Sequence, residues 1–276
     1  MKKIIQMFSR KKKRGSVVPR SELELFYENK LSYQYRVLHE RLNAEKPMLK
    51  TTSKSKRAYE AYDDREQLDY ENNSRMSVYN DQLVEMPFKE SRAHYLAYLY
   101  REIDKLLVPG KPLRVLEVGC GNCINIACLN EKYGNRVEIT GLELSPRRIN
   151  VAKKYFEDGL SGVSFQVGSI TEPITGWEDE KFDLVYSMHC LEQIAYECKN
   201  AVRQMNRLSK SRVVMIEPIF ELGNPIQRLY LINSDHNRIL LSSIQELELE
   251  ISRLEPLNIQ SNPSNQSSIV VINKTS

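Results

Sequence analysis

The spacing of apolar and polar positions changes near residue 112 of the chain. Before that point, apolar and aromatic residues recur at helical intervals in ELELFYENKLSYQYRVLHERL and FKESRAHYLAYLYREIDKLL. This spacing predicts amphipathic helices, and the second ends at VPGKP, where two prolines and a glycine stop it. We therefore expect residues 21–105 to be mostly helical, with a polar and loosely packed stretch at KTTSKSKRAYEAYDDREQLDYENNSR.

Short β-branched runs follow at intervals: RVLEV, VEITGLE, VSFQV, FDLVYS and RVVMIE. Helical segments separate them. One begins with Ser145 as its N-cap and Pro146 at the first helical position, and Gly159 follows as its stop. Apolar strands that alternate with helices predict a parallel sheet covered on both faces. The predicted fold class is therefore α/β, with a doubly wound sheet.

The C-terminal part departs from this alternation. A helix around SSIQELELEISRL precedes PLNIQ and SIVVIN, which the turn-rich SNPSNQS joins. We expect these two runs to form an antiparallel hairpin that closes the sheet edge.

The positive net charge of +4 resides in the first 20 residues. These contain eight of the 40 Lys and Arg residues and none of the 36 Asp and Glu residues, so the remainder carries a net charge of −4. We expect residues 1–20 to be a solvated, disordered tail. The alternative is a tail that contacts an anionic membrane surface or a nucleic acid.

No apolar run reaches the roughly 20 residues that span a bilayer, and IIQMF is too short for a secretory signal. We therefore expect a cytoplasmic protein. Cys120, Cys123 and Cys128 form C-x2-C-x4-C, but no second Cys or His pair stands nearby. A metal site needs about four ligands, so these residues are predicted to be packing thiols and not metal ligands.

The candidate chemistry begins at LEVGCGNC, residues 116–123, between a predicted strand and helix. Gly119 and Gly121 let the backbone approach a ligand without a Cβ in the way. Ligands of such sheets bind at the carboxyl ends of strands, beside the next helix. Glu143 ends the following strand, where a carboxylate can accept both hydroxyls of a ribose. The alternative is a tight turn and an unrelated surface carboxylate.

Two residues disfavour a dinucleotide ligand. The third glycine of a G-x-G-x-x-G fingerprint is replaced by Ile124. The charge of Glu117, at the strand end, would repel a phosphate but could favour an ammonium group. The predicted ligand is therefore a nucleoside that carries an amino acid.

The segments VLEVGCGNC, GLELS and FDLVYSMHCLEQI, in this order and spacing, resemble the class I S-adenosylmethionine-dependent methyltransferases over residues 91–276. The resemblance implies a Rossmann-like, seven-stranded sheet, mostly parallel, with a reversed C-terminal strand. Residues 21–90 would then be a helical extension or a lid over the pocket.

The resemblance also implies S-adenosylmethionine as the cofactor, and it assigns site residues. Glu117, Gly119, Cys120 and Gly121 would line the methionine portion, and Glu143 would hold the ribose hydroxyls. Leu144 would pack against adenine, Ser169 and Ile170 would border it, and Ser187 would offer backbone to the amino end. The sequence departs from the family pattern at Cys123, Ser169 and Gln193, which stand where a glycine, an aspartate and a histidine are frequent.

Methyl transfer needs alignment more than acid–base chemistry, and a base is required only when the acceptor must lose a proton. His189 and His236 are the candidates for such a base, and we favour His189. A structural histidine is the alternative for each. The motif NPPY, which in this family accompanies methylation of amino groups on adenine, cytosine or glutamine, is absent after the fourth strand.

The leading hypothesis is a methyltransferase that acts on a small or lipid-like acceptor, at oxygen or carbon. One alternative is methylation of RNA with the basic tail on phosphates. Another is a scaffold that binds the cofactor without turnover. A nicotinamide-dependent dehydrogenase is disfavoured by Ile124 and Glu117.

Overall fold

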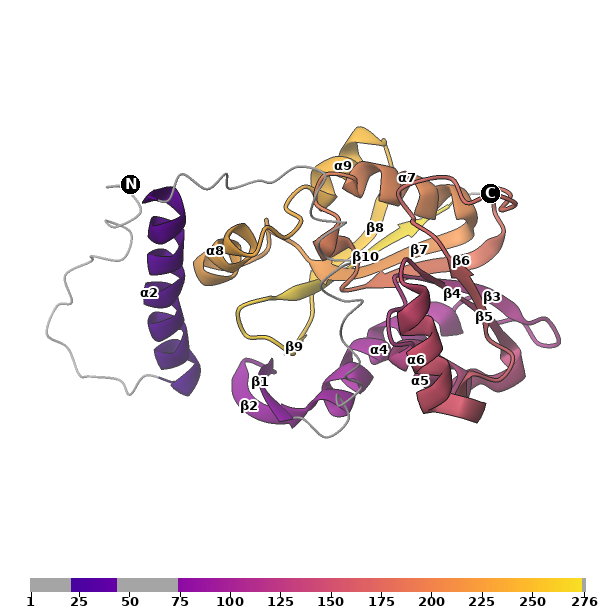
Figure 1. Cartoon of the computed structure of the whole chain (residues 1–276), viewed down its shortest axis with the longest axis horizontal. Helices are drawn as coiled ribbons and strands as arrows, with labels where there is room; N and C mark the ends of the chain where they lie inside the picture. Colours follow the sequence, from indigo (N-terminus) through magenta and orange to yellow (C-terminus); the bar gives the residue numbers. More distant parts are fainter. Residues whose placement is uncertain (1–20, 44–73, 275–276) are drawn as a thin grey trace, which may run out of the picture.

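The computed structural model describes residues 21–43 and 74–274 of the 276-residue chain. Figure 1 shows their arrangement, with the large sheet and its helices on the right and the helix of residues Glu22–Asn43, labelled α2, on the left. The predicted basic tail, residues 1–20, lies outside the described residues, as does nearly all of the polar stretch that follows residue 49.

The centre of the fold is a seven-stranded sheet with the spatial order β5-β4-β3-β6-β7-β10-β8. Neighbours from β5 to β7 pair in parallel, whereas β10 pairs antiparallel with both β7 and β8. The predicted seven-stranded, mostly parallel sheet with a reversed last strand is confirmed. The strands are β3 (Leu113–Val118), β4 (Val137–Glu143), β5 (Ser164–Val167), β6 (Phe182–Met188), β7 (Ser209–Pro218), β8 (Ile251–Pro256) and β10 (Ser267–Asn273).

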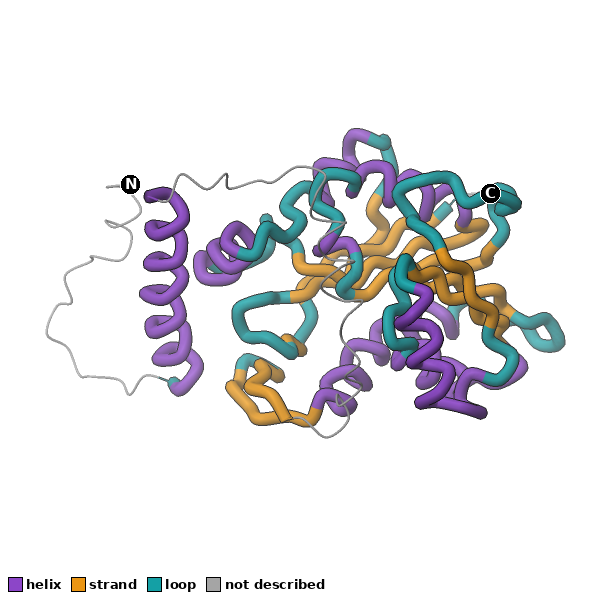
Figure 2. The backbone as a smooth tube through the Cα atoms, in the orientation of Figure 1, coloured by secondary structure: helices purple, strands orange, loops and turns teal. Residues whose placement is uncertain are grey.

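Helices cover both faces of this sheet, as Figure 2 shows. Successive strand residues point to opposite faces. Val115 therefore belongs to the core under α4, α5 and α6, whereas Leu116 belongs to the core under α7 and α9. The helices are α4 (Phe88–Asp104), α5 (Ile124–Tyr133), α6 (Pro146–Phe156), α7 (Cys198–Leu208) and α9 (Leu240–Glu246), and three short 3-10 turns are η1 (Gly134–Arg136), η2 (Glu157–Leu160) and η3 (Leu191–Gln193). The predicted N-cap of α6 is present, because Ser145 Oγ accepts the backbone N–H of Arg148 at 3.2 Å.

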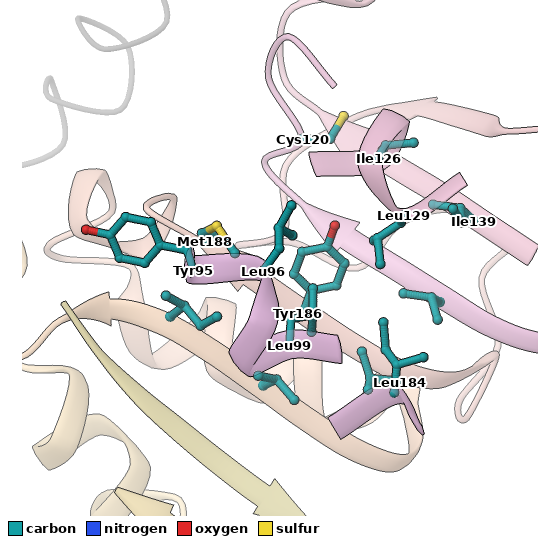
Figure 3. Packing of buried hydrophobic residues seen from close by; sticks show 14 of the residues in the cluster. Tyr95, Leu96, Leu99, Cys120, Ile126, Leu129, Ile139, Leu184, Tyr186 and Met188 are labelled. Atoms are coloured by element: carbon teal, nitrogen blue, oxygen red, sulfur yellow. The ribbon is translucent and has the colours of Figure 1, made fainter. Parts of the chain in front are cut away.

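The helix α4 attaches the N-terminal region to the sheet. Figure 3 shows Leu96 and Leu99 of α4 lying over Leu184 and Tyr186 of β6. Both leucines are fully buried, and burial of such a side chain contributes about 2 kcal/mol. At the C-terminal end of α4, the Glu102 carboxylate forms ion pairs with Lys105, Arg212 and Arg253, with nitrogen–oxygen distances of 2.7–2.8 Å. These contacts fix α4 to β7 and β8.

The predicted helical extension is correct for one segment and wrong for another. Residues Glu22–Asn43 form α2, but β1 (Ser74–Tyr79) and β2 (Gln82–Pro87) form an antiparallel hairpin. Its turn holds Asn80 and Asp81 at φ of 49° and 60°, which is the geometry of a two-residue hairpin turn. The short strand β9 (Ile259–Gln260) adds to β1 and completes a three-stranded sheet.

The C-terminal hairpin also differs from the prediction. The hairpin partner of β10 is β8, whose first four residues, ISRL, we expected at the end of the preceding helix, whereas α9 ends at Glu246. The strand β8 lies at the sheet edge and alternates between half-buried and exposed residues. The predicted strand PLNIQ is reduced to β9, which leaves the large sheet for the small one.

The helix α2 packs against α8 (Pro225–Asn233), beside which it stands in Figure 1. Asn233 Nδ2 donates to Oε1 of Gln34 at 2.7 Å and to its backbone oxygen at 2.9 Å. The hydroxyl of Tyr27 donates to the carbonyl oxygen of Pro263 at 3.1 Å. Through these bonds α2 supports the β9–β10 connection. Within residues 21–43 and 74–274, no helix is long and apolar enough to cross a membrane.

Candidate active site

A cavity of about 420 Å³ lies at the carboxyl ends of β3, β4 and β6. After β3 the chain adds β4 and β5 on one side of the sheet, and then β6 on the other. Ligands of doubly wound sheets bind at this switch of direction. One half of the lining, the nucleotide half, contains Gly119, Gly121, Glu143, Leu144, Ser169 and Ile170; the other, the acceptor half, contains Arg92, His189, Glu192, Tyr230, Asn262 and Asn265.

The turn after β3 requires glycine at its first position. Gly119 has a φ of +69°, and a Cβ there would lie 2.2 Å from the sulfur of Cys190. The backbone N–H groups of Gly119 and Cys120 both donate to the carbonyl oxygen of Leu142. Cys123, at the position of the third motif glycine, adopts a φ of +61°, which a residue with a Cβ rarely does.

The carboxylate of Glu143 braces this turn. Its Oε2 accepts the backbone N–H of Gly121 at 2.8 Å, and its Oε1 accepts that of Ser145 at 3.0 Å. The guanidinium of Arg148 lies 3.6 Å from Oε2. The structure therefore brings Gly121 and Glu143 together as the sequence spacing predicted, on the wall of one cavity.

Glu117 lies behind the cavity and does not belong to its lining. Its Oε1 accepts a hydrogen bond from Asn125 Nδ2 at 2.7 Å. Burial raises the pKa of Glu117 to about 7, although the Asn125 amide offsets part of this effect. Asn125 does line the cavity, and its buried Oδ1 has no hydrogen-bond partner among the described residues. Sequence reasoning missed Asn125, although it is the second residue of the helix that follows the glycine turn.

The residues predicted to surround adenine mostly line the cavity. Leu144 is 41% exposed there, and Ile170 is buried. The hydroxyl of Ser169 is bonded within its own turn, to the hydroxyl of Thr171 at 2.8 Å and to its backbone N–H at 3.3 Å. Ser187 is fully buried and is not part of the lining, which its neighbour Met188 joins instead.

His189 lines the cavity but is held on both ring nitrogens. A guanidinium nitrogen of Arg92 lies 3.4 Å from Nδ1, and Ser267 Oγ lies 2.6 Å from Nε2. Because arginine only donates, Nδ1 accepts, and Nε2 carries the proton that Ser267 accepts. Burial, followed by the charge of Arg92, lowers the pKa of His189 to about 4. The favoured base is thus a neutral imidazole without an acceptor nitrogen for the substrate.

His236 stands outside the lining, behind Glu192. Its Nδ1 lies 3.8 Å from Glu192 Oε2, and its Nε2 lies 3.5 Å from Gln193 Nε2. His236 therefore does not meet the cavity itself but contacts residues that line it, among them the carboxylate of Glu192, which the sequence reasoning missed. The position of Glu192, one turn after the end of β6, could have identified it.

Glu217 positions this carboxylate. Its Oε1 accepts the backbone N–H groups of Cys190 and Leu191 at 3.0 and 3.1 Å, and its Oε2 accepts that of Glu192 at 3.2 Å. Burial, with the neighbouring charge of Glu192, raises the pKa of Glu217 to about 8. Glu217 is then largely uncharged near neutral pH, so it adds little negative charge beside Glu192.

The two cysteines of the turn differ in their access to the cavity. Cys120 is buried but lines the cavity, as the predicted cofactor site requires, whereas Cys123 is fully buried behind it, with the two sulfur atoms 3.9 Å apart. Over the described ranges, no group of three or more His, Cys, Asp or Glu side chains is arranged to hold a metal ion.

Comparisons with known proteins agree with this geometry. A family model described as a methyltransferase domain matches residues 109–236. The ajmaline N-methyltransferase of Rauvolfia serpentina is 33% identical over 111 residues, which are 38% of this chain and 35% of that enzyme. The chain therefore spans about a third of the length of this curated relative.

Two solved structures share the fold. Geranyl diphosphate C-methyltransferase from Streptomyces coelicolor A3(2) is 13% identical, with a TM-score of 0.57 over 82% of this chain and 99% of that one. The cyclase SpnF is 17% identical, with a TM-score of 0.58 over 82% and 97% of the two chains. Residues 109–236 therefore match a methyltransferase domain, and the fold is similar to that of S-adenosylmethionine-dependent methyltransferases, as the sequence motifs implied.

The cofactor of this class, S-adenosylmethionine, fits the residues of the nucleotide half. The unpartnered Asn125 Oδ1 is an acceptor suited to an ammonium group. Gly119 and Gly121 keep side chains away from the turn, and Glu143 presents carboxylate oxygens on the same wall. In a methyltransferase of this class, Leu144 and Ile170 would then offer apolar surface to the base.

Proposed function

We propose that this protein transfers the methyl group of S-adenosylmethionine to a small, polar acceptor. The observation that carries the proposal is the braced turn: Glu143 accepts the N–H of Gly121 at the switch point of a methyltransferase domain. When bound, the cofactor would supply a methyl group on a sulfonium, already activated for transfer. The chain's own task is to orient the acceptor and exclude water.

The acceptor half supports a small acceptor. Apart from Phe88, Ile194 and Tyr230, it is lined mainly by polar side chains such as those of Glu192 and Asn265. This favours a polar molecule over the lipid-like one that the sequence suggested. Oxygen and carbon remain the predicted methylated atoms, and the N-methyltransferase named above supports nitrogen as a third.

Calorimetric titration with S-adenosylhomocysteine tests the proposal, beside Glu143→Ala and with NAD as the control ligand. We expect micromolar binding of the wild type, at least tenfold weaker binding of the variant and none of NAD. A screen of small acceptors with labelled methyl donor then tests transfer.

Absence of binding to the wild type would refute the proposal. Binding without transfer to any acceptor would favour the scaffold alternative. Methylation of RNA depends on residues 1–20, which lie outside the described residues, and no other observation supports it.

A further inference from the structure

Glu192 lies where an acceptor must pass. It belongs to η3, two residues after Cys190, whose sulfur fills the space beside Gly119. Its side chain is 12% exposed and lines the acceptor half of the cavity. Glu192 therefore lines the cavity two residues along the chain from Cys190, which packs against the glycine turn of the nucleotide half.

The hydrogen bonds of Glu192 leave acceptor capacity toward the cavity. Gln193 Nε2 donates to Oε1 at 3.1 Å, and Asn265 Nδ2 donates to Oε2 at 3.0 Å. A carboxylate can accept about four hydrogen bonds, so two positions remain. Burial alone would raise the pKa of Glu192, but electrostatic interactions with the His236 and His189 rings and hydrogen bonds from the two amides lower it overall.

Glu192 stays ionised in the cavity wall without a lysine or arginine partner. Within residues 21–43 and 74–274, no lysine or arginine forms an ion pair with it, and His236 lies 3.8 Å from its Oε2. The lowered pKa of Glu192 means that the protein itself stabilises this negative charge. A cationic ligand group in the cavity can therefore bind an ionised carboxylate that still has two acceptor positions.

The walls around Glu192 suit a compact apolar body. Phe88, Ile194 and Tyr230 line the same half of the cavity. An aromatic or aliphatic skeleton can pack on these side chains while its polar group reaches the carboxylate. Asn262 and Asn265 supply further hydrogen-bonding groups nearby.

We propose that the methyl acceptor is an amine with an apolar skeleton, and that its ammonium group binds Glu192. An ammonium nitrogen has no lone pair, so it would first pass one proton to the Glu192 carboxylate. The bond from the amine nitrogen to the methyl group would then form as the bond from the methyl group to the donor sulfur breaks, which leaves S-adenosylhomocysteine. This inference rests on the proposed function, because the amine would enter the cavity that also holds the methyl donor. Glu217 and His236 act through Glu192 and are positioning residues.

Matched amine and alcohol pairs test the inference. The probes are benzylamine, phenethylamine and tryptamine, against benzyl alcohol, 2-phenylethanol and tryptophol. Each is titrated into the full chain with and without S-adenosylhomocysteine, for the wild type, Glu192→Gln and Glu178→Gln. Glu178 is exposed and precedes the amino end of β6, so it controls for loss of one negative charge.

For the wild type, we expect at least one amine to bind about 10- to 100-fold more tightly than its alcohol, the range for a charge-assisted hydrogen bond. Glu192→Gln should remove this preference and leave alcohol and S-adenosylhomocysteine binding within about threefold. Glu178→Gln should behave as the wild type. Unchanged binding of the homocysteine ligand also reports that the variant is folded.

The inference is overturned if no amine binds, if amines and alcohols bind equally, or if Glu192→Gln weakens both alike. The proposed function is judged separately by the titration of S-adenosylhomocysteine. An amine preference in a protein that does not bind S-adenosylhomocysteine would refute methyl transfer and leave an amine-binding cavity. Binding of the homocysteine ligand without amine preference would refute only the acceptor class.

Discussion

Replacing Gly119 by alanine perturbs the closest backbone contact in the site. The new Cβ would lie 2.2 Å from the sulfur and 2.8 Å from the Cβ of Cys190. Cys190 cannot retreat easily, because its backbone N–H is bonded to Glu217 at 3.0 Å. The left-handed conformation adds a second cost, since Gly119 has a φ of +69°.

These two terms give the expected size of the effect. A left-handed residue with a Cβ costs about 1 kcal/mol, and overpacking of a tight contact costs about 2 kcal/mol. Gly119→Ala should therefore lower the free energy of unfolding by about 3 kcal/mol in urea denaturation. It should also weaken S-adenosylhomocysteine binding more than tenfold, because the turn must shift to relieve the contact.

Two controls separate the terms. Gly110 has a φ of +77° and nothing within 4 Å of its virtual Cβ, so Gly110→Ala should cost only about 1 kcal/mol. Cys190→Gly removes the two nearest atoms and leaves Cα at 3.9 Å. In that background, Gly119→Ala should also cost about 1 kcal/mol. The reasoning is refuted if Gly119→Ala costs no more than Gly110→Ala, or costs the same with and without Cys190.

Three further predictions concern stability and the cavity wall. Glu102→Gln should destabilise the protein by about 2–4 kcal/mol in urea, because two largely buried arginines lose their carboxylate; a loss below 1 kcal/mol would contradict this. Because its pKa is lowered from 6.5 to about 4, His189 adds stability that is nearly complete above pH 6.5 and is lost as the pH falls toward 4. Relative to His189→Gln, the free energy of unfolding of the wild type should fall by roughly 1.5 kcal/mol between pH 6.5 and 5. If the unfolding free energies of the two proteins change in parallel with pH, the lowered pKa of His189 is refuted. Tyr27→Phe removes the bond to Pro263 and should speed proteolysis within residues 261–265 without changing S-adenosylhomocysteine affinity, whereas an unchanged cleavage rate would show that α2 does not support this segment.

The large sheet could be predicted because its signals are local. Apolar runs such as those around Leu116 and Val185 lie on strands buried from both faces, and the helices between them carry their own caps. The nucleotide half followed from the same pattern, because Gly119, Gly121 and Glu143 stand at the ends of adjacent predicted strands.

Two errors in the fold have local causes. The hairpin turn at Asn80 and Asp81 carries residue types that tolerate a positive φ, but we expected the whole of residues 21–105 to be mostly helical. The edge strand β8 alternates apolar and charged residues and follows a helical run without a glycine or proline between them. Its strand character therefore became visible only through pairing with β10.

The electrostatics of the acceptor half depend on contacts that no local pattern contains. His189 is neutral because Arg92, 97 residues away in the chain, approaches one nitrogen and Ser267, 78 residues away, occupies the other. Glu192 accepts a hydrogen bond from Asn265, which lies 73 residues further along the chain. A histidine in a sequence motif is a natural candidate for a base, but its hydrogen-bond partners decide which ring nitrogen carries the proton and whether the other is free to accept one.

The two halves of the cavity are built in different ways, and this bears on how acceptor choice can change. The nucleotide half consists of turns at strand ends, so its geometry is fixed by the sheet itself. The acceptor half takes His189 and Glu192 from the segment after β6, and its other residues from α4, α8 and the β9–β10 connection, to which Tyr27 of α2 bonds. The segments α4, α8 and β9–β10 lie outside the regular strand–helix alternation. Substitutions in them can therefore alter the choice of acceptor without disturbing the braced turn. A substitution of Glu143, in contrast, removes the hydrogen bonds that hold the turn and so disturbs cofactor binding as well.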